Sequence, residues 1–371
     1  MVIVSQLLLY ITLALLMGVM LGNSLLAGHM PKFHVPKWLV ITAVGGVILF
    51  ASAPSLEIIM NLSGGMDVWT AATMVLLEFN IGNAWLFTYF IGIVFVVLIA
   101  FNDLGEDRIV SGAGMVIVIL MAIAQGLSSH AFEQASFWGV TVHSVHLLAV
   151  MVWGGMLIIL GWFTKVQADW PRILSWFTPL ALISMLVLAV SGVFTMDVVT
   201  ANPDGEQINI VQRFTDAWLT DYGQSLLFKH LLLITLLGFG TINGILFRKR
   251  LAREPKLQIQ PWIKTESFLI LLVLAITGFM GEQALPNQIE TIVSEEGTSS
   301  LFQSIYGQAV PPEMMVSLSF GFISILLFIL AALFFGCMLY AARSRMHPAA
   351  SFIMAICFVL AGYLGLMLGV V

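Results

Sequence analysis

Hydrophobic positions run through the chain in long blocks that short polar stretches separate. A helix needs about 20 apolar residues to cross a bilayer, and ten blocks approach or exceed that length. They cover residues 5–27, 38–55, 83–101, 109–128, 138–163, 173–198, 222–247, 264–284, 314–341 and 349–370. No block shows the apolar–polar alternation of a half-buried strand. The pattern predicts an all-α fold, a polytopic transmembrane bundle of about 8–10 helices.

One stretch does not fit this pattern clearly. Residues 56–82 are half apolar, and they are consistent with a loop plus an interfacial or re-entrant helix that leads into the third span. No interval between blocks exceeds about 30 residues, whereas a small soluble domain needs roughly 50. We therefore expect a single transmembrane domain over residues 1–371, without a soluble domain. The apolar N-terminus lacks a basic n-region and an A-x-A site, so we expect a retained first span.

Composition and charge support the membrane assignment and orient it. Of the 371 residues, 60% are hydrophobic and 9% are charged, against about 25% charged in a soluble domain. With the N-terminus outside, all but two of the 15 Lys and Arg fall in inner loops or at their edges. The exceptions are Arg213 and Lys229. The positive-inside rule then predicts a multi-pass protein of the bacterial plasma membrane with both termini extracytoplasmic.

Three of the seven histidines lie in one stretch at the outer side of this map. His130 sits in the loop before the fifth span, and His143 and His146 lie in that span's first turns. Residues three apart on a helix are separated by about 60° around the axis, so His143 and His146 share a face. They either hydrogen-bond neighbouring carbonyls near the headgroups or form the outer part of a metal site.

Methionines offer thioether ligands near these imidazoles. Imidazole binds copper, zinc, iron and nickel, while thioether favours Cu(I). Met151 lies deeper in the fifth span and Met196 closes the sixth, next to Asp197. Most methionines pack in cores, but these two extend the histidine stretch into a candidate His/Met path. Acidic residues in the outer loops either raise the local cation concentration or are simply solvated.

Ionisable and aromatic residues within the spans form a second set. Lys229 and His230 lie about two turns into the seventh span, and Glu266 opens the eighth. An intramembrane charge needs a partner or a water-filled cavity. Lys229 therefore either locks two helices through an ion pair or belongs to a path. Glu266 either favours its helix N-terminus at the inner interface or belongs to the same path.

Motifs of several other protein classes are absent. The sequence has no Walker A lysine motif, no DKTG-like phosphorylation site and no C-x-x-C, which disfavours an ATP-driven metal pump. It also lacks H-E-x-x-H, G-x-S-x-G and C-x-x-C-H, so we expect a protein that is not an enzyme. Cys337 and Cys357 lie in apolar runs and are better explained as small core residues than as ligands.

A succession of short motifs resembles the copper resistance protein D (CopD) family, including the membrane part of YcnJ-type copper importers. In order they are Phe79–Leu86 (FNIGNAWL), His130–Ala131, His146–Gly155 (HLLAxxxWGG), Phe177–Ser184 (FTPLALIS), Ser191–Phe194 (SGVF), Trp218–Lys229 (WxTxYGxxLxxK), Glu266 and Pro286. The resemblance covers about 75–320. Among these motifs, His130, His146, Trp153, Tyr222, Lys229 and Glu266 match recurrent positions of the family. His143 departs from the family pattern and adds a possible ligand.

The resemblance implies a copper importer that moves copper, with Cu(I) favoured over Cu(II), toward the cytoplasm. The implied partners are copper ions, the lipid bilayer and a possible extracytoplasmic copper chaperone, with no nucleic acid. Two other functions stay open. A haem- or quinone-binding redox protein would use His146 and His230 as axial haem ligands. An assembly factor that delivers copper to a membrane oxidase would use the same copper ligands without a complete path.

Overall fold

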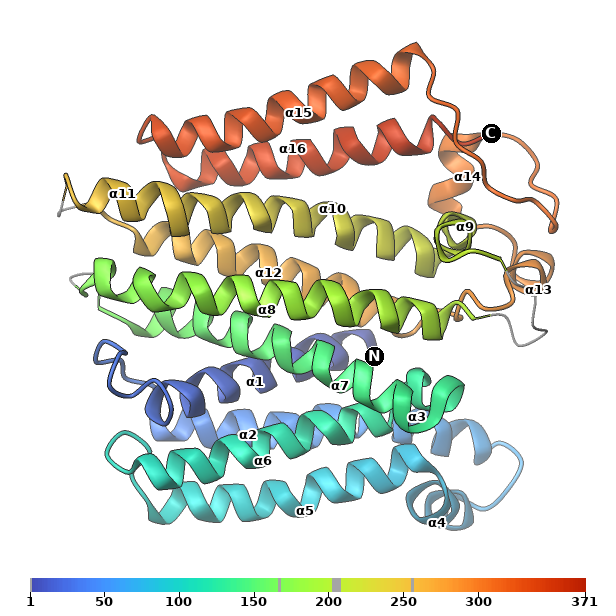
Figure 1. Ribbon diagram of the computed structural model, residues 1–371. Helices are drawn as coiled ribbons and strands as arrows, with labels where there is room; N and C mark the ends of the chain where they lie inside the picture. Colours follow the sequence, from blue (N-terminus) through green and yellow to red (C-terminus); the bar gives the residue numbers. More distant parts are fainter. Residues whose placement is uncertain (1, 166–167, 202–207, 255–256) are drawn as a thin grey trace. The chain divides into compact units, whose positions relative to one another are not determined.

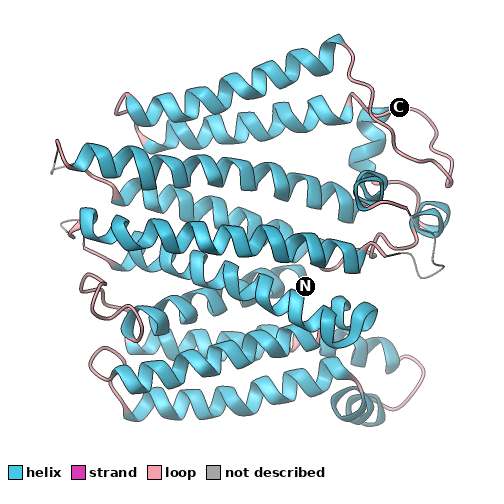
Figure 2. Ribbon diagram, viewed as in Figure 1, coloured by secondary structure: helices cyan, strands magenta, loops and turns pink. Residues whose placement is uncertain are grey.

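The computed structural model describes residues 2–165, 168–201, 208–254 and 257–371. Throughout these residues the regular elements are helices, and none forms a strand (Figure 2). Ten helices among them are long and apolar enough to cross a membrane. Backbone N–H and C=O groups have no water to bond to in a bilayer core, and a helix satisfies them within its own segment. The all-α, polytopic fold predicted from the sequence is confirmed.

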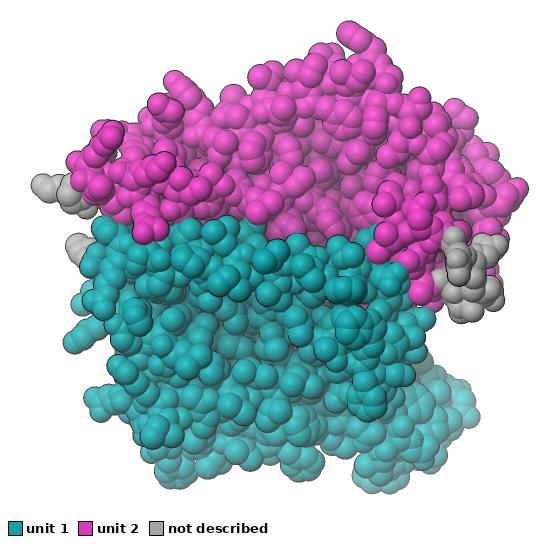
Figure 3. Space-filling model, viewed as in Figure 1, with its two compact units in different colours: residues 1–198 teal, residues 199–371 magenta. Residues whose placement is uncertain are grey.

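The chain divides into two compact units, residues 1–198 and 199–371 (Figure 3). The long helices of the first unit are α1 (Val2–Asn23), α2 (Lys37–Ala51), α5 (Asn80–Phe101), α6 (Arg108–Leu127), α7 (His130–Ile158) and α8 (Trp170–Val199). Those of the second unit are α10 (Asp221–Thr241), α12 (Gln260–Met280), α15 (Phe322–Arg343) and α16 (Pro348–Met367) (Figure 1). The helices α7 and α10 continue into π-helical turns, η1 (Ile159–Phe163) and η3 (Ile242–Phe247).

The ambiguous stretch 56–82 forms two short helices. The first, α3 (Ala53–Leu62), follows α2 directly, and a proline in its first turn suits a helix start. The second, α4 (Val68–Glu78), is capped by Asp67, whose carboxylate accepts the Thr70 N–H at 3.1 Å. At Phe79 the backbone is extended, which separates α4 from α5. Helical structure therefore replaces most of the predicted loop.

Helix α1 is the central helix of the first unit. It contacts α2, α6 and α7, while α5 packs against α2 and α6. Leu9, Leu13 and Met20 of α1 are fully buried in a cluster that also contains side chains of α2, α5, α6 and α7. The exposed faces of the outer helices remain apolar, as on Phe90 and Phe101 of α5. This is the pattern of a bundle whose outer surface contacts lipid.

Small residues allow α1 and α7 to approach closely. A Cβ atom at Gly155 of α7 would overlap the carbonyl oxygen of Ala14, and one at Gly18 would overlap the carbonyl oxygen of Gly155. Backbone approach through glycine and alanine is a main source of helix association in bilayers, where burial of apolar surface contributes little. Gly155 therefore fixes the position of α7 against α1.

In the second unit, α10 lies between α12 and α16, and α15 packs chiefly on α16. The sequence predicted a span from residue 314, but α15 begins at Phe322. That boundary was wrong because residues 317–319 are extended and pair with the end of the chain. Ser317 and Val371 exchange backbone hydrogen bonds of 3.3 and 3.0 Å, and the Ser319 N–H donates to the Gly369 carbonyl at 2.7 Å.

A carboxylate anchors this extended segment to α9 (Ile210–Asp216). The Asp216 Oδ1 atom accepts the Val316 N–H at 2.7 Å and the Gln212 side-chain N–H at 2.8 Å. Asp216 is buried. Burial raises the pKa of its carboxyl group above the ordinary value, although the two hydrogen bonds oppose the shift. The folded state therefore binds this proton more tightly than the unfolded state does.

We expect Gly155→Ala to destabilise the first unit by about 2 kcal/mol or more, because the added methyl group overlaps the α1 backbone. Gly112→Ala on α6 is the matched control, since a Cβ there meets nothing within 4 Å. Thermal unfolding of the purified variants in detergent measures both effects. Equal unfolding temperatures for the two variants would contradict the proposed role of Gly155.

The anchor at Asp216 is expected to weaken as pH rises. A raised pKa in the folded state means that the stabilisation is complete below the ordinary Asp value of about 4 and is lost as pH rises through the folded-state pKa. Hydrogen exchange at the Val316 amide, corrected for the intrinsic rate, measures the opening of this contact. Asp216→Asn keeps the acceptor oxygen but removes the titrating carboxyl group. In this variant the protection of the Val316 amide is expected to stay constant with pH. A parallel pH dependence in the variant would rule out Asp216 as the cause.

Candidate functional site

A break in α7 separates His130 from the other two histidines. The backbone leaves helical geometry at Ala135 and at Ser136, which has a positive φ of 48°. His130 lies on the short segment before this break, where its Nδ1 is 3.1 Å from the Glu133 carboxylate, and both side chains are exposed. His143 and His146 lie on the long segment after it. The break was not predicted, because no glycine or proline marks it in the sequence.

His146 is held by a serine of α8. Its Nδ1 is 3.1 Å from the Ser191 hydroxyl oxygen, and that hydroxyl donates its single proton to the Val187 carbonyl at 2.6 Å. The serine can therefore only accept from the imidazole, so Nδ1 carries a hydrogen. In the neutral ring this leaves the lone pair on Nε2, a usual metal-binding atom of imidazole. Metal-ligating histidines commonly donate their other ring N–H in this way.

His143 and Met196 lie in the same part of the α7–α8 pair. At one end of this part, the ring of His146 lies next to Gly192, where a Cβ would be 3.4 Å from the imidazole Cε1. At its other end, Val142 and Val198 belong to one buried cluster. Along α7, His143 lies between Val142 and His146. Along α8, Met196 lies between Gly192 and Val198. His143, His146 and Met196 thus lie at a similar level along the two helices, and all three are half-buried. Met196 is five residues from Ser191, which places it about 140° around α8 from the hydroxyl that contacts His146.

Met151 and Trp153 lie away from this level, in the interior of the first unit. Met151 is 1% exposed and belongs to the apolar cluster around α1. Five residues along a helix correspond to about 140° of rotation, so Met151 and His146 face different sides of α7. Trp153 is 2% exposed. Its indole N–H has no hydrogen-bond partner among the described residues.

The other candidate residues belong to the second unit. Tyr222 is buried in a cluster with Leu226 and Met280. The exposed His230 donates its Nδ1–H to the Leu226 carbonyl at 2.7 Å, so its Nε2 carries the lone pair, as in His146. Lys229 is half-buried beside it. The predicted haem pair His146 and His230 is divided between the two units and stays a prediction.

Glu266 has a partner that the sequence did not reveal. The Asn243 side-chain N–H donates to the Glu266 carboxylate at 2.6 Å, and the residues are 2% and 1% exposed. Asn243 lies in the π-helical turn η3, and its Oδ1 has no hydrogen-bond partner among the residues that the structure describes. Such turns are frequent at functional sites. The one signal for Asn243 was an amide within the apolar run of residues 242–247.

Clusters of the usual metal-ligating side chains do not occur in the described part of the chain. Across residues 2–165, 168–201, 208–254 and 257–371, no three side chains of His, Cys, Asp or Glu are grouped to hold a metal ion. A metal site between α7 and α8 would therefore need the thioether of Met196 beside the two imidazoles. This combination suits Cu(I) better than zinc or a hard cation.

Comparison with known proteins identifies a family for part of the chain. Residues 171–280 match the family model CopD, copper resistance protein D. The match covers α8 to α12 and includes Met196, Tyr222, Lys229, His230 and Glu266, whereas His130, His143 and His146 precede it. No curated protein and no solved structure matches the chain. The family predicted from the sequence is confirmed for this segment, and the resemblance to YcnJ-type importers stays a prediction.

We expect Asn243→Ala to destabilise the second unit by about 2–3 kcal/mol, because the Glu266 carboxylate loses a donor in a buried position. Thr241→Ala, two residues earlier at an exposed position, is expected to change stability by less than about 0.5 kcal/mol. Thermal unfolding in detergent distinguishes them. If Asn243→Ala lowers stability no more than Thr241→Ala does, the buried Glu266 carboxylate does not depend on the Asn243 amide.

Proposed function

We propose that this multi-pass membrane protein, whose residues 171–280 match the copper resistance protein D family, is a copper permease that moves copper ions toward the cytoplasm. The observation that carries the proposal is the hydrogen bond from His146 to Ser191. It directs the imidazole lone pair to Nε2, at the level of α7 and α8 that also holds His143 and Met196. The membrane fold and the family match support a copper-related role.

Copper is the cargo in this proposal, so the outer site must bind it reversibly. Two imidazoles and one thioether form a soft set that favours Cu(I) over Cu(II). Conduction requires sites that are weak or multiple enough to release the ion. His130, exposed on the outer segment of α7, serves as the first contact, and His143, His146 and Met196 receive the ion from it. Trp153 in the first unit, and Tyr222, Lys229, His230 and Glu266 in the second, are proposed as polar residues that support transport. Met151 packs in the apolar cluster around α1, so it is not proposed as a ligand beside His146.

The charge distribution supports a direction of transport and a source of copper. Basic residues gather in the loops assigned to the cytoplasm, and acidic residues gather in the outer loops. An extracytoplasmic copper chaperone is proposed to dock on these outer carboxylates and to load the histidines. The sequence holds no ATP-binding or phosphorylation motif, which favours a permease over an ATP-driven pump. The bilayer itself is its other partner.

We expect His146→Ala to abolish copper binding at this site and copper uptake. Ser191→Ala, which removes the partner of Nδ1, is expected to weaken copper binding by about 10–100-fold. His29→Ala is the matched control, because this exposed histidine lies on the opposite side in the predicted topology. Bound copper per protein and cellular copper accumulation measure these effects. Equal losses in His29→Ala and His146→Ala would contradict the assignment of the outer site.

A visible absorption spectrum of the same samples tests the redox alternative. Stoichiometric copper without a Soret band supports the permease, and its loss in the His130/His143/His146 triple alanine variant supports the histidine site. A haem band would instead support axial ligation by His146 and His230. Normal copper accumulation after deletion of the protein, with a selective loss of oxidase copper, would indicate delivery to an oxidase.

A further inference from the structure

A cavity of about 890 Å³ lies at one end of the second unit, and none of the candidate copper residues lines it. Four candidate membrane spans begin or end around it. Its lining includes Arg250 of α11 (Arg248–Leu251), which is the last turn of the span that begins with α10, and Trp262 of α12, Ala342 of α15 and Pro348 of α16. The ends of membrane-spanning helices lie at the depth of the lipid headgroups. The cavity therefore opens at the membrane–water interface.

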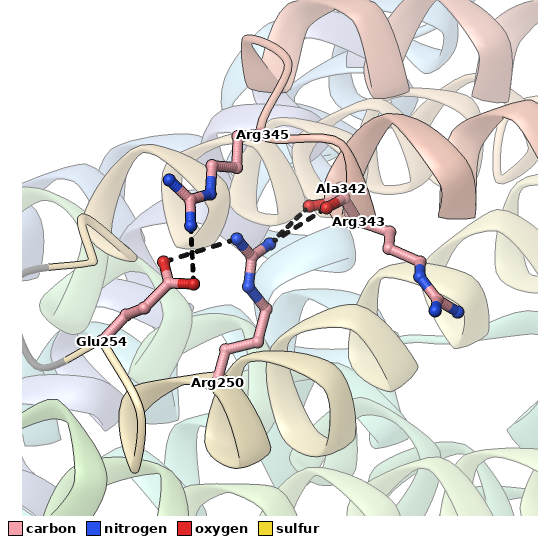
Figure 4. Close-up of polar contacts among 5 residues, drawn as sticks. All are labelled: Arg250, Glu254, Ala342, Arg343 and Arg345. Atoms are coloured by element: carbon pink, nitrogen blue, oxygen red, sulfur yellow. Dashed lines mark hydrogen bonds and ion pairs between the residues drawn. The ribbon is translucent and has the colours of Figure 1, made fainter.

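Two arginines and one glutamate form the polar side of this cavity (Figure 4). Arg250 donates to the carbonyls of Ala342 and Arg343 at 3.0 and 3.4 Å, and it is 3.5 Å from the Glu254 carboxylate. Arg345 donates to the same carboxylate at 2.7 Å. The three side chains together carry one net positive charge. A single negative charge in the cavity would neutralise them.

Arg345 keeps most of its donors available to a ligand. Its side chain is 66% exposed, and of the five N–H groups of a guanidinium one is used by Glu254. Its backbone has a positive φ of 60° just beyond the end of α15. Glycine adopts this helix-ending conformation without strain, whereas a side chain is strained in it. Strained backbone that persists despite its cost often marks a functional position.

His347 adds a further donor beside Arg345. Its Nδ1 accepts the Ala349 N–H at 3.2 Å, which caps α16. In the neutral ring the hydrogen must then be on Nε2, and His347 lines the cavity. The guanidinium of Arg345 and the imidazole of His347 thus offer N–H donors from positions two residues apart in the connection between α15 and α16. Phosphate oxygens are, with carboxylate oxygens, the acceptors that a guanidinium binds most strongly.

Apart from Gln258, the rest of the lining is apolar. Leu257, Pro261, Trp262, Met346 and Pro348 surround the charged side. A ligand that matches this surface carries one negative phosphate group and a hydrocarbon portion, and it resides at the membrane interface. We propose that the cavity binds the headgroup of an anionic phospholipid, with its phosphodiester between Arg345 and His347 and its acyl chains along the apolar wall. This site is independent of the proposed copper function.

Titration of the purified protein with phosphatidylglycerol in phosphatidylcholine-containing micelles tests the proposal. Lipid retained on the protein is counted by native mass spectrometry, and the unfolding temperature is followed in parallel. We expect phosphatidylglycerol to be retained in preference to phosphatidylcholine and to raise the unfolding temperature. Arg345→Gly is expected to lower the apparent affinity for phosphatidylglycerol by about tenfold, the loss of one charge-assisted contact.

The chain supplies its own controls. Arg343→Ala removes a charge two residues away whose side chain does not line the cavity, so wild-type affinity is expected. Arg345→Gly is expected to unfold near the wild-type temperature in phosphatidylcholine alone, because relief of the left-handed strain offsets the lost ion pair. If it does not fold, Arg345→Lys, which keeps the charge without the fork, carries the test with an intermediate affinity. Three outcomes would overturn the proposal. They are a loss of phosphatidylglycerol affinity in Arg343→Ala as large as that in Arg345→Gly, equal retention of phosphatidylglycerol and phosphatidylcholine, and the same stabilisation by soluble glycerol phosphate as by the lipid.

Discussion

The close contact between α1 and α7 determines how the candidate copper residues are presented. Gly155 rests against the backbone of α1, and nine residues separate it from His146. Nine residues correspond to about half a turn beyond two full turns of an α-helix. When the glycine faces α1, His146 must therefore face the opposite side, where Ser191 of α8 receives it. The packing of small residues on one face of α7 therefore determines that the His146 imidazole on the opposite face lies toward α8.

The sequence predicted the elements of this fold well because length and hydropathy decide them. Ten spans and the shared face of His143 and His146 follow from the number of apolar residues and from helix periodicity alone. Contacts between helices depend on packing that no local pattern encodes. Ser191, Gly192 and Asn243 were therefore not identified as partners, although the first two lie in a motif already noted for the family resemblance.

Errors in the predicted boundaries have a common origin in tertiary pairing. Residues 314–321 are apolar enough to continue a helix, yet Ser317 and Ser319 bond to the end of the chain and Val316 bonds to Asp216. These backbone groups obtain partners outside a helix, so hydropathy alone does not decide their conformation. The break at Ser136 shows the same limit, because its positive φ belongs to a residue with no local preference for it.

The π-helical turn η3 changes the phase of the helix that contains it. Asn243 and Arg250 are seven residues apart, and in an unbroken α-helix they would lie nearly on one line. Residues 242–247 form wide turns that accommodate an extra residue, which rotates the next helical turn by about 100° relative to a regular helix. Asn243 can thus bond to α12 while Arg250 bonds to the end of α15. One continuous helix therefore contacts two neighbouring helices on different sides. In a regular α-helix, both contacts would have to lie on the same side.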